Sequence, residues 1–395
     1  MGPLEGVRVL DFTVFQQGPQ ASLVFADMGA HVIKVEAPQF GDLGRVVGSV
    51  GEERFSPYFL AHNRGKRSMS LNLKNEEAVN ICLELAAKTD VAIHNFRPGV
   101  MERLGLGYEE MRARNETIIY GHASGWGPEG PRAKHPAFDL AAQAQGGIVG
   151  VTGEPGGFPL PAGAAIADYV GALNLATAVI SALYSRERTG KGQRIDTSLL
   201  GGQIAMQAWE IQHYITHRQM GRAGRGHAYL PTIWRVFETS DSYVVVGGLP
   251  ENRWPKFCAA LDLPEIEHDE RFAGYGVRMG NIAELYEILD EAFLKKTSDQ
   301  WMELLKEADC ICAPVATYED LIDDPQVRAN DYIVDVDHPT QGRLPVVGSP
   351  WRFSETPTKV APAAPELGEH TEEVLQELGY SWERIEELRS QGALG

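Results

Sequence analysis

The strongest constraint on the fold is a repeated alternation of short β-rich runs with helical periodicity along the first 125 residues. Strands that alternate with helices form parallel sheets, because each helix carries the chain back to the same edge of the sheet. We therefore expect an α/β fold with a large domain built on a Rossmann-like parallel sheet. The strands are expected at 6–13, 31–36, 67–73, 91–95 and 117–121, and the helices at 21–29, 76–89 and 101–114.

The second half of the chain indicates a smaller α/β domain. Residues 167–183 are apolar on nearly all sides, which predicts a buried helix; a charged, glycine-containing segment at 186–192 is expected to break it, and a strand follows at 193–199. We expect a large domain at 1–200, a linker with a glycine-rich loop at 201–230, a small α/β domain at 231–325, and a return segment at 326–395 packing on the large domain. Further elements are expected as a strand at 242–247, helices at 254–261, 282–293 and 297–308, a linker or wrapping strand at 340–368, and two short acidic helices at 369–394.

Composition narrows the partners and the compartment. The net charge of −18 and pI near 5.1 argue against nucleic acid as the main partner, because phosphate backbones require a basic surface. The longest largely apolar stretch, at 171–184, is shorter than a membrane span requires, and no signal-peptide pattern opens the chain. Four cysteines in 395 residues do not indicate a disulfide framework. We expect a cytoplasmic protein without a membrane partner.

Several common chemistries lack their motifs. The loop after the first strand reads Gln-Gln-Gly-Pro at 16–19, so no dinucleotide fingerprint follows it. Residues 121–125, Gly-His-Ala-Ser-Gly, place the serine one position late for a nucleophile elbow. The Thr-Gly-Lys-Gly-Gln-Arg run at 189–194 lacks the pattern of a phosphate-binding P-loop. Cys310 and Cys312 form a lone C-x-C pair, so no metal site is expected.

Asp168 is the residue that most needs an explanation. It lies within the almost wholly apolar segment 163–171, where the expected buried helix begins. A carboxylate among apolar residues requires a partner or a function, because burying a charge is costly. One interpretation is a helix cap that accepts backbone N–H groups. The other is a nucleophile that the helix dipole keeps ionised while apolar walls remove its water.

At this point the residues resemble a known family. The chain is similar to the family III CoA transferases, which include formyl-CoA:oxalate and crotonobetainyl-CoA:carnitine CoA transferases, and the resemblance extends nearly end to end. No single motif decides it, but many matches occur in order. They stand at 3–12, 28–36, 95–99, 103–105, 138–139, 143, 146, 167–168, 188–193, 324–329 and 367–371.

The resemblance implies that Asp168 is the nucleophile. Its carboxylate attacks an acyl-CoA thioester to give an acyl–aspartyl anhydride, and the released CoA thiolate then forms an aspartyl-CoA thioester. The acceptor acid repeats these steps in reverse. The implied substrates are an acyl-CoA and a carboxylic acid, with no cofactor beyond CoA as substrate. The implied assembly is an interlocked, ring-like homodimer.

The resemblance also places a CoA-binding site within the large domain. Asp139 takes the family's acidic position near the reacting thioester, where it is a second catalytic group or a helix cap. Ala37 departs from the family pattern, because some members have an arginine at this position. The resemblance therefore does not supply that phosphate contact here. The matched CoA-binding positions are Gln16, Gln17, Leu71, Lys74, Asn95, Phe96, Arg97 and Arg103.

An acid-free basic segment accompanies these positions. It runs from 54 to 74 with five cations and no acidic residue, although the whole chain is acidic. Its cations contact the phosphates of CoA or form a solvated turn. They are Arg54, Arg64, Lys66, Arg67 and Lys74.

Two alternatives to a transferase remain open. An α-methylacyl-CoA racemase requires a histidine directly before the residue equivalent to Asp139, and this chain has Phe138 there. A non-catalytic CoA-binding subunit of a hetero-oligomeric transferase would not need Asp168.

The glycine-rich residues 221–226 match a mobile lid loop of some members, or form a linker. Arg222 and Arg225 either face an acceptor carboxylate or are solvated.

Overall fold

The computed structural model describes residues 2–49, 56–230, 232–339, 341–358 and 360–395. The chain divides into two compact units. The first consists of Met1–Gly147, Ala162–Ile211 and Asp324–Gly395, and the second of Ile148–Pro161 and Gln212–Asp323. Residues 148–161, which we expected in the large domain, therefore belong to the second unit.

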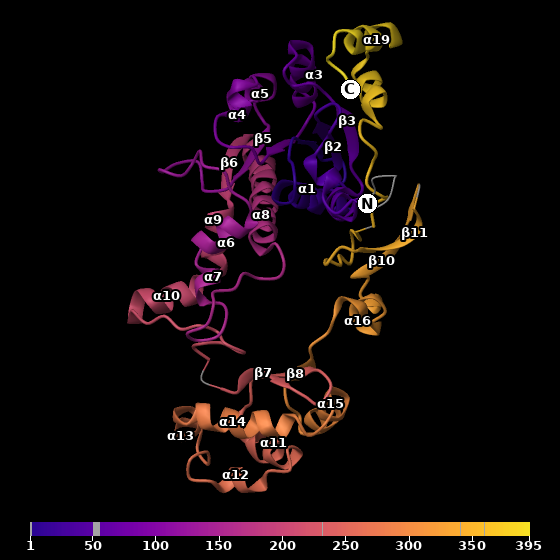
Figure 1. The fold of residues 1–395 in the computed structure, drawn as a ribbon. Helices are drawn as coiled ribbons and strands as arrows, with labels where there is room; N and C mark the ends of the chain where they lie inside the picture. Colours follow the sequence, from indigo (N-terminus) through magenta and orange to yellow (C-terminus); the bar gives the residue numbers. More distant parts are fainter. Residues whose placement is uncertain (1, 50–55, 231, 340, 359) are drawn as a thin grey trace. The chain divides into compact units, whose positions relative to one another are not determined.

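A parallel sheet forms the centre of the first unit (Figure 1). Its order is β3-β2-β1-β4-β5-β6, which is the order of a doubly wound Rossmann sheet. All five neighbouring pairs are parallel, so the expected α/β class and parallel sheet are confirmed. The strands are β1 (Arg8–Asp11), β2 (His31–Glu36), β3 (Arg67–Ser70), β4 (Val91–His94), β5 (Ile119–Ser124) and β6 (Gln193–Ser198).

The strand order reverses beside β1, which pairs with β2 on one side and with β4 on the other. Loops that leave the carboxyl ends of β1 and β4 diverge at this point, and a doubly wound fold binds its ligands in the crevice between them. The sheet therefore locates the region in which a small-molecule site is expected.

Helices cover both faces of the sheet because alternate strand residues are apolar on both sides. The helices α1 (Gln17–Asp27) and α8 (Ile166–Thr189) pack on the face that buries Val9 and Ile93. The opposite face buries Leu10 and Tyr120. It is covered by α3 (Glu76–Ala86), α5 (Tyr108–Arg114), α18 (Thr371–Leu378) and α19 (Trp382–Ser390).

The helix α8 is long and apolar enough to cross a membrane by length and composition alone. The stretch at 171–184, which we compared with the length of a membrane span, lies inside a helix of 24 residues, so the length argument does not hold. One side of α8 packs on α1, β5 and β6, with Leu175 and Val179 fully buried, while Tyr184 on another side is exposed. The helix α8 therefore packs on the core of its unit with one side. The sequence predicted a buried helix, and the exposed side differs from that prediction.

Two of the differences from the expected helix boundaries follow from glycines with a left-handed φ. The expected helix at 101–114 is divided into α4 (Val100–Arg103) and α5, because Gly105 adopts a left-handed φ of 74° between them. The expected break at 186–192 lies later, since α8 continues to Thr189 and ends at Gly190, whose φ is 69°. Arg186 remains helical and pairs with Asp90 at 2.9 Å.

The second unit has its own core around an antiparallel sheet in the order β7-β8-β9. Phe237, Phe257 and Trp301 are fully buried there among helices. The strands are β7 (Trp234–Glu238), β8 (Tyr243–Gly247) and β9 (Cys312–Pro314); the helices are α7 (Ile148–Val151), α11 (Trp254–Ala260), α12 (Pro264–His268), α13 (Tyr275–Gly280), α14 (Ile282–Phe293), α15 (Ser298–Glu307) and α16 (Tyr318–Ile322). The helix α10 (Ala208–His217) runs across the division between the units.

The return segment belongs to the first unit. A hairpin of β10 (Ile333–His338) and β11 (Gly342–Val347) precedes the C-terminal helices. Leu394 then pairs with Leu71 beyond the end of β3, and the C-terminus lies beside that strand in Figure 1. The remaining helices of this unit are α2 (Pro57–Asn63), α6 (Asp139–Gln145), α9 (Leu199–Met206) and α17 (Pro325–Ala329).

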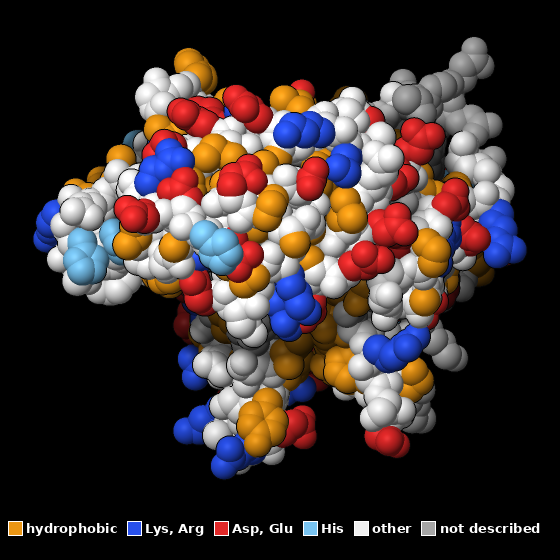
Figure 2. All heavy atoms as spheres, turned by 90° about the horizontal axis from the view of Figure 1, so that it is seen from below, with side chains coloured by type: hydrophobic (Ala, Val, Ile, Leu, Met, Phe, Trp, Pro, Cys, Tyr) orange, Lys and Arg blue, Asp and Glu red, His pale blue; other side chains and the backbone are white. Residues whose placement is uncertain are grey.

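The acidic excess does not form one patch on the face shown in Figure 2, where acidic side chains are spread among basic and apolar ones.

Candidate active site

A pocket of about 220 Å³ lies at the carboxyl edge of the parallel sheet, within the first unit. The loop after β1 and the loop after β4 form two of its walls, and the start of α8 contributes Asp168. Six of the ten residues that the sequence assigns to the site line this pocket. They are Gln16, Gln17, Asn95, Phe96, Arg97 and Asp168.

Asp168 lies in the first turn of α8, but it does not cap the helix. The residue at the N-cap position, Ala165, makes no side-chain cap bond. Asp139 caps the helix from α6 instead, because its Oδ1 accepts hydrogen bonds from the backbone N–H groups of Ala167 at 2.7 Å and Asp168 at 3.1 Å. The helix-cap interpretation therefore applies to Asp139 and not to Asp168.

The Asp168 carboxylate is left without a hydrogen bond from any residue in the described part of the chain. Burial, together with the negative charge of Asp139, raises the pKa of the Asp168 carboxyl to about 7. The N-terminal position in α8 favours the ionised form, but burial and the like charge outweigh it. A carboxylate that is poorly solvated and unpaired is a stronger nucleophile than one in water.

Gln17 supplies a free hydrogen-bond donor to the same pocket. It is the first residue of α1 and is only 4% exposed, and its Nε2 group has no hydrogen-bond partner in the part of the chain that the structure describes. Gly171, one turn after Asp168, leaves room for this amide, since a Cβ atom at 171 would come within 2.7 Å of Nε2. A buried amide without a partner costs free energy, so a ligand oxygen at this position would satisfy it.

Asn95 holds the loop that carries Gln16 and Gln17. Its Oδ1 accepts from the Val14 N–H at 2.9 Å, and its Nδ2 donates to the Val14 carbonyl at 2.8 Å. The next residue, Phe15, has a φ of 63°, which is unfavourable for a bulky side chain. Asn95 is thus engaged by the protein itself and acts as a positioning residue.

A buried ion pair also holds the loop after β1. Lys34 is inaccessible and pairs with Asp42 at 2.9 Å while donating to the Thr13 carbonyl at 2.7 Å. Asp42 in turn accepts from the Phe15 N–H at 2.9 Å. The backbone of residues 13–15 is therefore fixed by a buried ion pair as well as by Asn95.

The loop after β4 brings a cation to the pocket. Arg97 is exposed and makes no ion pair with any described residue. The preceding carbonyl, that of Phe96, is 2.9 Å from Nε2 of His122, whose Nδ1 lies 2.8 Å from Asp196. This chain of contacts fixes the backbone from which the Arg97 side chain extends.

Family membership follows from comparison with known proteins. A model described as CoA-transferase family III matches residues 4–371. The chain belongs to this family. It is 35% identical to human succinyl-CoA:glutarate CoA-transferase over 99% of this chain and 90% of that protein. It is 32% identical to formyl-CoA:oxalate CoA-transferase of Bradyrhizobium sp. over 99% of this chain and 97% of that protein.

A solved structure confirms the architecture of this CoA transferase. The crystal structure of a CaiB/BaiF family protein from Brucella suis superposes with a TM-score of 0.87 at 33% identity, covering 95% of this chain and 99% of that one. The resemblance, the fold class and the enzyme class expected from the sequence are therefore confirmed. As family III enzymes do, the protein acts on acyl-CoA and carboxylic acid substrates.

The other assigned residues of the CoA transferase lie outside the pocket. Leu71 is fully buried in the core, so any contact with CoA would use its backbone. Lys74 and Arg103 are exposed and make no ion pair with the described residues, and Asp139 lies behind the start of α8. CoA is a long molecule, so cations away from the pocket remain candidates for its phosphates.

Three of the five cations in the basic segment have a different role from either one we expected. Arg64 is buried and pairs with Asp27 at 2.5 Å, and Lys66 is inaccessible and pairs with Asp11 at 3.2 Å. Arg67 binds Glu373 and Glu377 on α18. These three cations neutralise carboxylates of the protein, so they are neither a solvated turn nor free for phosphate, and Arg54 lies outside the described residues.

The arginines of the glycine-rich loop are also occupied within the second unit. Arg222 donates to the carbonyl oxygens of Glu154 and Gly157, while Arg225 pairs with Glu154 and Asp290. Both guanidinium groups are therefore engaged with acceptors of the second unit in this structure.

Sequence reasoning missed Tyr58, on α2. Burial and the negative charges of Asp168, Asp42 and Asp139 raise the pKa of the Tyr58 hydroxyl, so this side chain lies within electrostatic reach of the nucleophile candidate. No motif surrounds Tyr58, and its only sequence signal is the Ser-Pro that opens a short helix. Tyr58 comes close to Asp168 only because of the way α2 packs in the fold, and no local sequence pattern shows that packing.

Proposed function

We propose that the protein transfers CoA from an acyl-CoA to a carboxylic acid through covalent intermediates on Asp168. The observation that carries this proposal is the Asp168 carboxylate itself. It is largely buried in a pocket, is not used as a helix cap, and has a raised pKa of about 7. A structural aspartate would be expected to have hydrogen-bonding partners.

The reaction conserves the energy of the thioester at each step. A carboxylate oxygen of Asp168 attacks the acyl carbon, the C–S bond breaks, and an acyl–aspartyl anhydride and CoA thiolate form. The thiolate attacks the aspartyl carbonyl carbon, which releases the donor acid and leaves an aspartyl-CoA thioester. The acceptor carboxylate then attacks this thioester, and the thiolate attacks the acceptor carbonyl of the resulting anhydride, which restores Asp168.

The neighbouring residues fit supporting roles in this scheme. Gln17 Nε2, which has no partner among the described residues, would donate to an oxygen that becomes negative in the tetrahedral intermediates. Arg97 would bind a phosphate of CoA. Asp139 would act as a positioning residue that fixes the N-terminal turn of α8 and raises the pKa of Asp168.

The relatives suggest which two substrate pairs to assay first. These are succinyl-CoA with glutarate and formyl-CoA with oxalate. We propose a small dicarboxylic acid as one of the two acids.

Trapping the thioester tests the proposal. Hydroxylamine added during turnover should convert the aspartyl-CoA thioester to a hydroxamate, which mass spectrometry would locate at Asp168. Glu187→Gln, an exposed change on the same helix, is the matched control and should be trapped like the wild type. An Asp168→Asn enzyme that is folded and fully active, or a hydroxamate on another residue, would disprove the assignment.

A further inference from the structure

A second pocket, of about 560 Å³, lies at the opposite edge of the same sheet. Arg8 and His31 are the first residues of β1 and β2, so this groove is at the amino ends of the strands. The Asp168 pocket is formed by loops that leave the carboxyl ends. The groove is lined by Arg8, Val9, His31, Ile33, Arg67, Leu85, Lys88, Thr89, Val374, Glu377 and Leu378.

The groove has an apolar floor. Leu85 and Val374 are buried beneath it, and Ile33 and Leu378 are partly buried against the same core. These side chains come from β2, the end of α3 and α18. A ligand in the groove would therefore contact both the sheet and α18.

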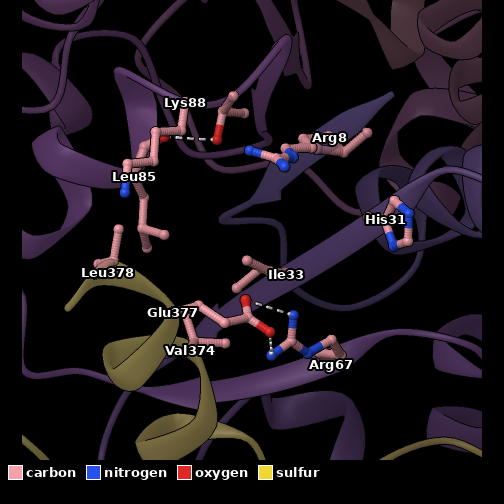
Figure 3. A pocket seen from close by; sticks show the side chains of 11 residues that line it. Arg8, His31, Ile33, Arg67, Leu85, Lys88, Val374, Glu377 and Leu378 are labelled. Atoms are coloured by element: carbon pink, nitrogen blue, oxygen red, sulfur yellow. Dashed lines mark hydrogen bonds and ion pairs between the residues drawn. The ribbon is translucent and has the colours of Figure 1, made fainter. Parts of the chain in front are cut away.

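The rim is cationic although the protein is acidic. The lining holds three cations, Arg8, Arg67 and Lys88, against one carboxylate, Glu377, which gives a local net charge of +2. Glu377 is paired with Arg67 at 2.9 Å. The side chains of Arg8 and Lys88 have no ion-pair partner among the described residues. Figure 3 shows these two on one side of the groove, with Arg67 and Glu377 on the other and Ile33 between.

The nearby acidic groups leave these two cations available. Asp90 accepts from the Arg8 backbone N–H at 2.8 Å and from the Arg186 guanidinium at 2.9 Å, so its charge is already engaged. Glu373 pairs with Arg67 at 3.0 Å. The free positive charge of the groove therefore belongs to Arg8 and Lys88, with the exposed His31 imidazole nearby.

We propose that this groove binds a carboxylate with an aliphatic body, at a site separate from the Asp168 pocket. The head group would lie between Arg8 and Lys88, and the aliphatic part would cover Ile33, Leu85 and Leu378. A phosphate is the less suitable anion here. The helix end at this edge is the carboxyl end of α3, which offers no free N–H groups for phosphate oxygens. Its partial negative charge also disfavours a dianion more than a carboxylate of charge −1.

Decanoate is the probe, and isothermal titration calorimetry on the full chain measures its binding. We expect saturable binding that about 0.5 M salt weakens, because two exposed cations hold the head group. Decanol, which keeps the chain but lacks the charge, should bind more weakly, and inorganic phosphate should not bind. The Arg8→Gln/Lys88→Gln double variant should weaken decanoate binding by about fivefold or more.

Matched controls separate this groove from the active site. Lys256→Gln changes an exposed lysine of α11 that does not line the groove, and it should leave decanoate binding unchanged. The double variant should keep wild-type CoA transfer, because Arg8 and Lys88 lie at the other edge of the sheet. A photoactivatable diazirine analogue of decanoate should label peptides that contain 8–9, 31–33 and 374–378.

Several results would overturn the proposal. These are no saturable decanoate binding, equal binding by the double variant, tighter binding of phosphate, or labelling confined to peptides around Asp168. A loss of self-association in the double variant, without decanoate binding by the wild type, would assign the groove to a contact between copies of the chain. None of these outcomes depends on Asp168 being the nucleophile.

Discussion

Replacing Asp168 by asparagine should stabilise the protein while it abolishes CoA transfer. The ionised carboxylate is largely buried, has no hydrogen bond from the described residues, and lies near the like charge of Asp139. Asparagine has nearly the same shape and no charge. The substitution therefore removes the free-energy cost of burying an ionised carboxylate. Substitutions that stabilise a protein at its active site commonly reduce its activity.

The magnitude and the pH dependence follow from the pKa shift. The pKa of Asp168 rises from 3.8 to about 7 on folding, and one unit corresponds to about 1.4 kcal/mol. Between these two values the folded state holds a proton that the unfolded state has lost, so wild-type stability falls as pH rises. The stabilisation by Asp168→Asn should thus be near zero at about pH 4, increase up to about pH 7, and level off at no more than about 4 kcal/mol.

Differential scanning calorimetry across this pH range measures the effect as the difference in Tm between variant and wild type. Glu187→Gln is the matched control, because it removes an exposed carboxylate from the same helix and should give no comparable rise. A Tm difference that is independent of pH, or a less stable Asp168→Asn protein at pH 8, would refute the reasoning.

Four further outcomes are expected. With succinyl-CoA as donor, kcat/KM should rise with pH and inflect near 7, because only the ionised Asp168 attacks; a flat profile would contradict this. Asp139→Asn should move that inflection to lower pH by removing the like charge, whereas Asp139→Ala should in addition lose a helix cap worth about 1 kcal/mol. An unchanged inflection in the asparagine variant would show that Asp139 does not act on Asp168. Arg97→Gln should raise KM for acyl-CoA about tenfold but leave KM for an acyl-pantetheine donor unchanged, and equal effects on both would exclude a phosphate contact. Lys34→Met should destabilise the protein by about 3–5 kcal/mol, measured by thermal unfolding, since it leaves Asp42 buried without its ion pair; an unaltered Tm would contradict the role given to Lys34.

The sheet could be predicted from the sequence because each of its strands carries a local signal. The strand expected at 31–36 matches β2 to the residue. Asp168 was also recognisable, since an acidic residue in an apolar segment stands out and a family resemblance explains it. These features depend on residues close together in the chain.

The partners of charged residues could not be predicted in the same way. Arg64 pairs with Asp27, 37 positions away, and Asp139 caps a helix that begins 27 positions later. No local pattern distinguishes a cation that binds phosphate from one that neutralises a buried carboxylate. The helix expected at 101–114 failed for a different reason, because the pattern shows a periodic apolar face but not the left-handed φ of Gly105 that divides it.

The most direct test of the central claim follows the oxygen atoms of Asp168. In the proposed reaction, the acceptor acid leaves one of its oxygens on the aspartate, and the next donor acid carries one aspartate oxygen away. Turnover with an acceptor labelled with oxygen-18 should therefore place oxygen-18 in the Asp168 peptide and in the donor acid released afterwards, as mass spectrometry would show. Transfer of CoA without label in either product would contradict a covalent role for Asp168.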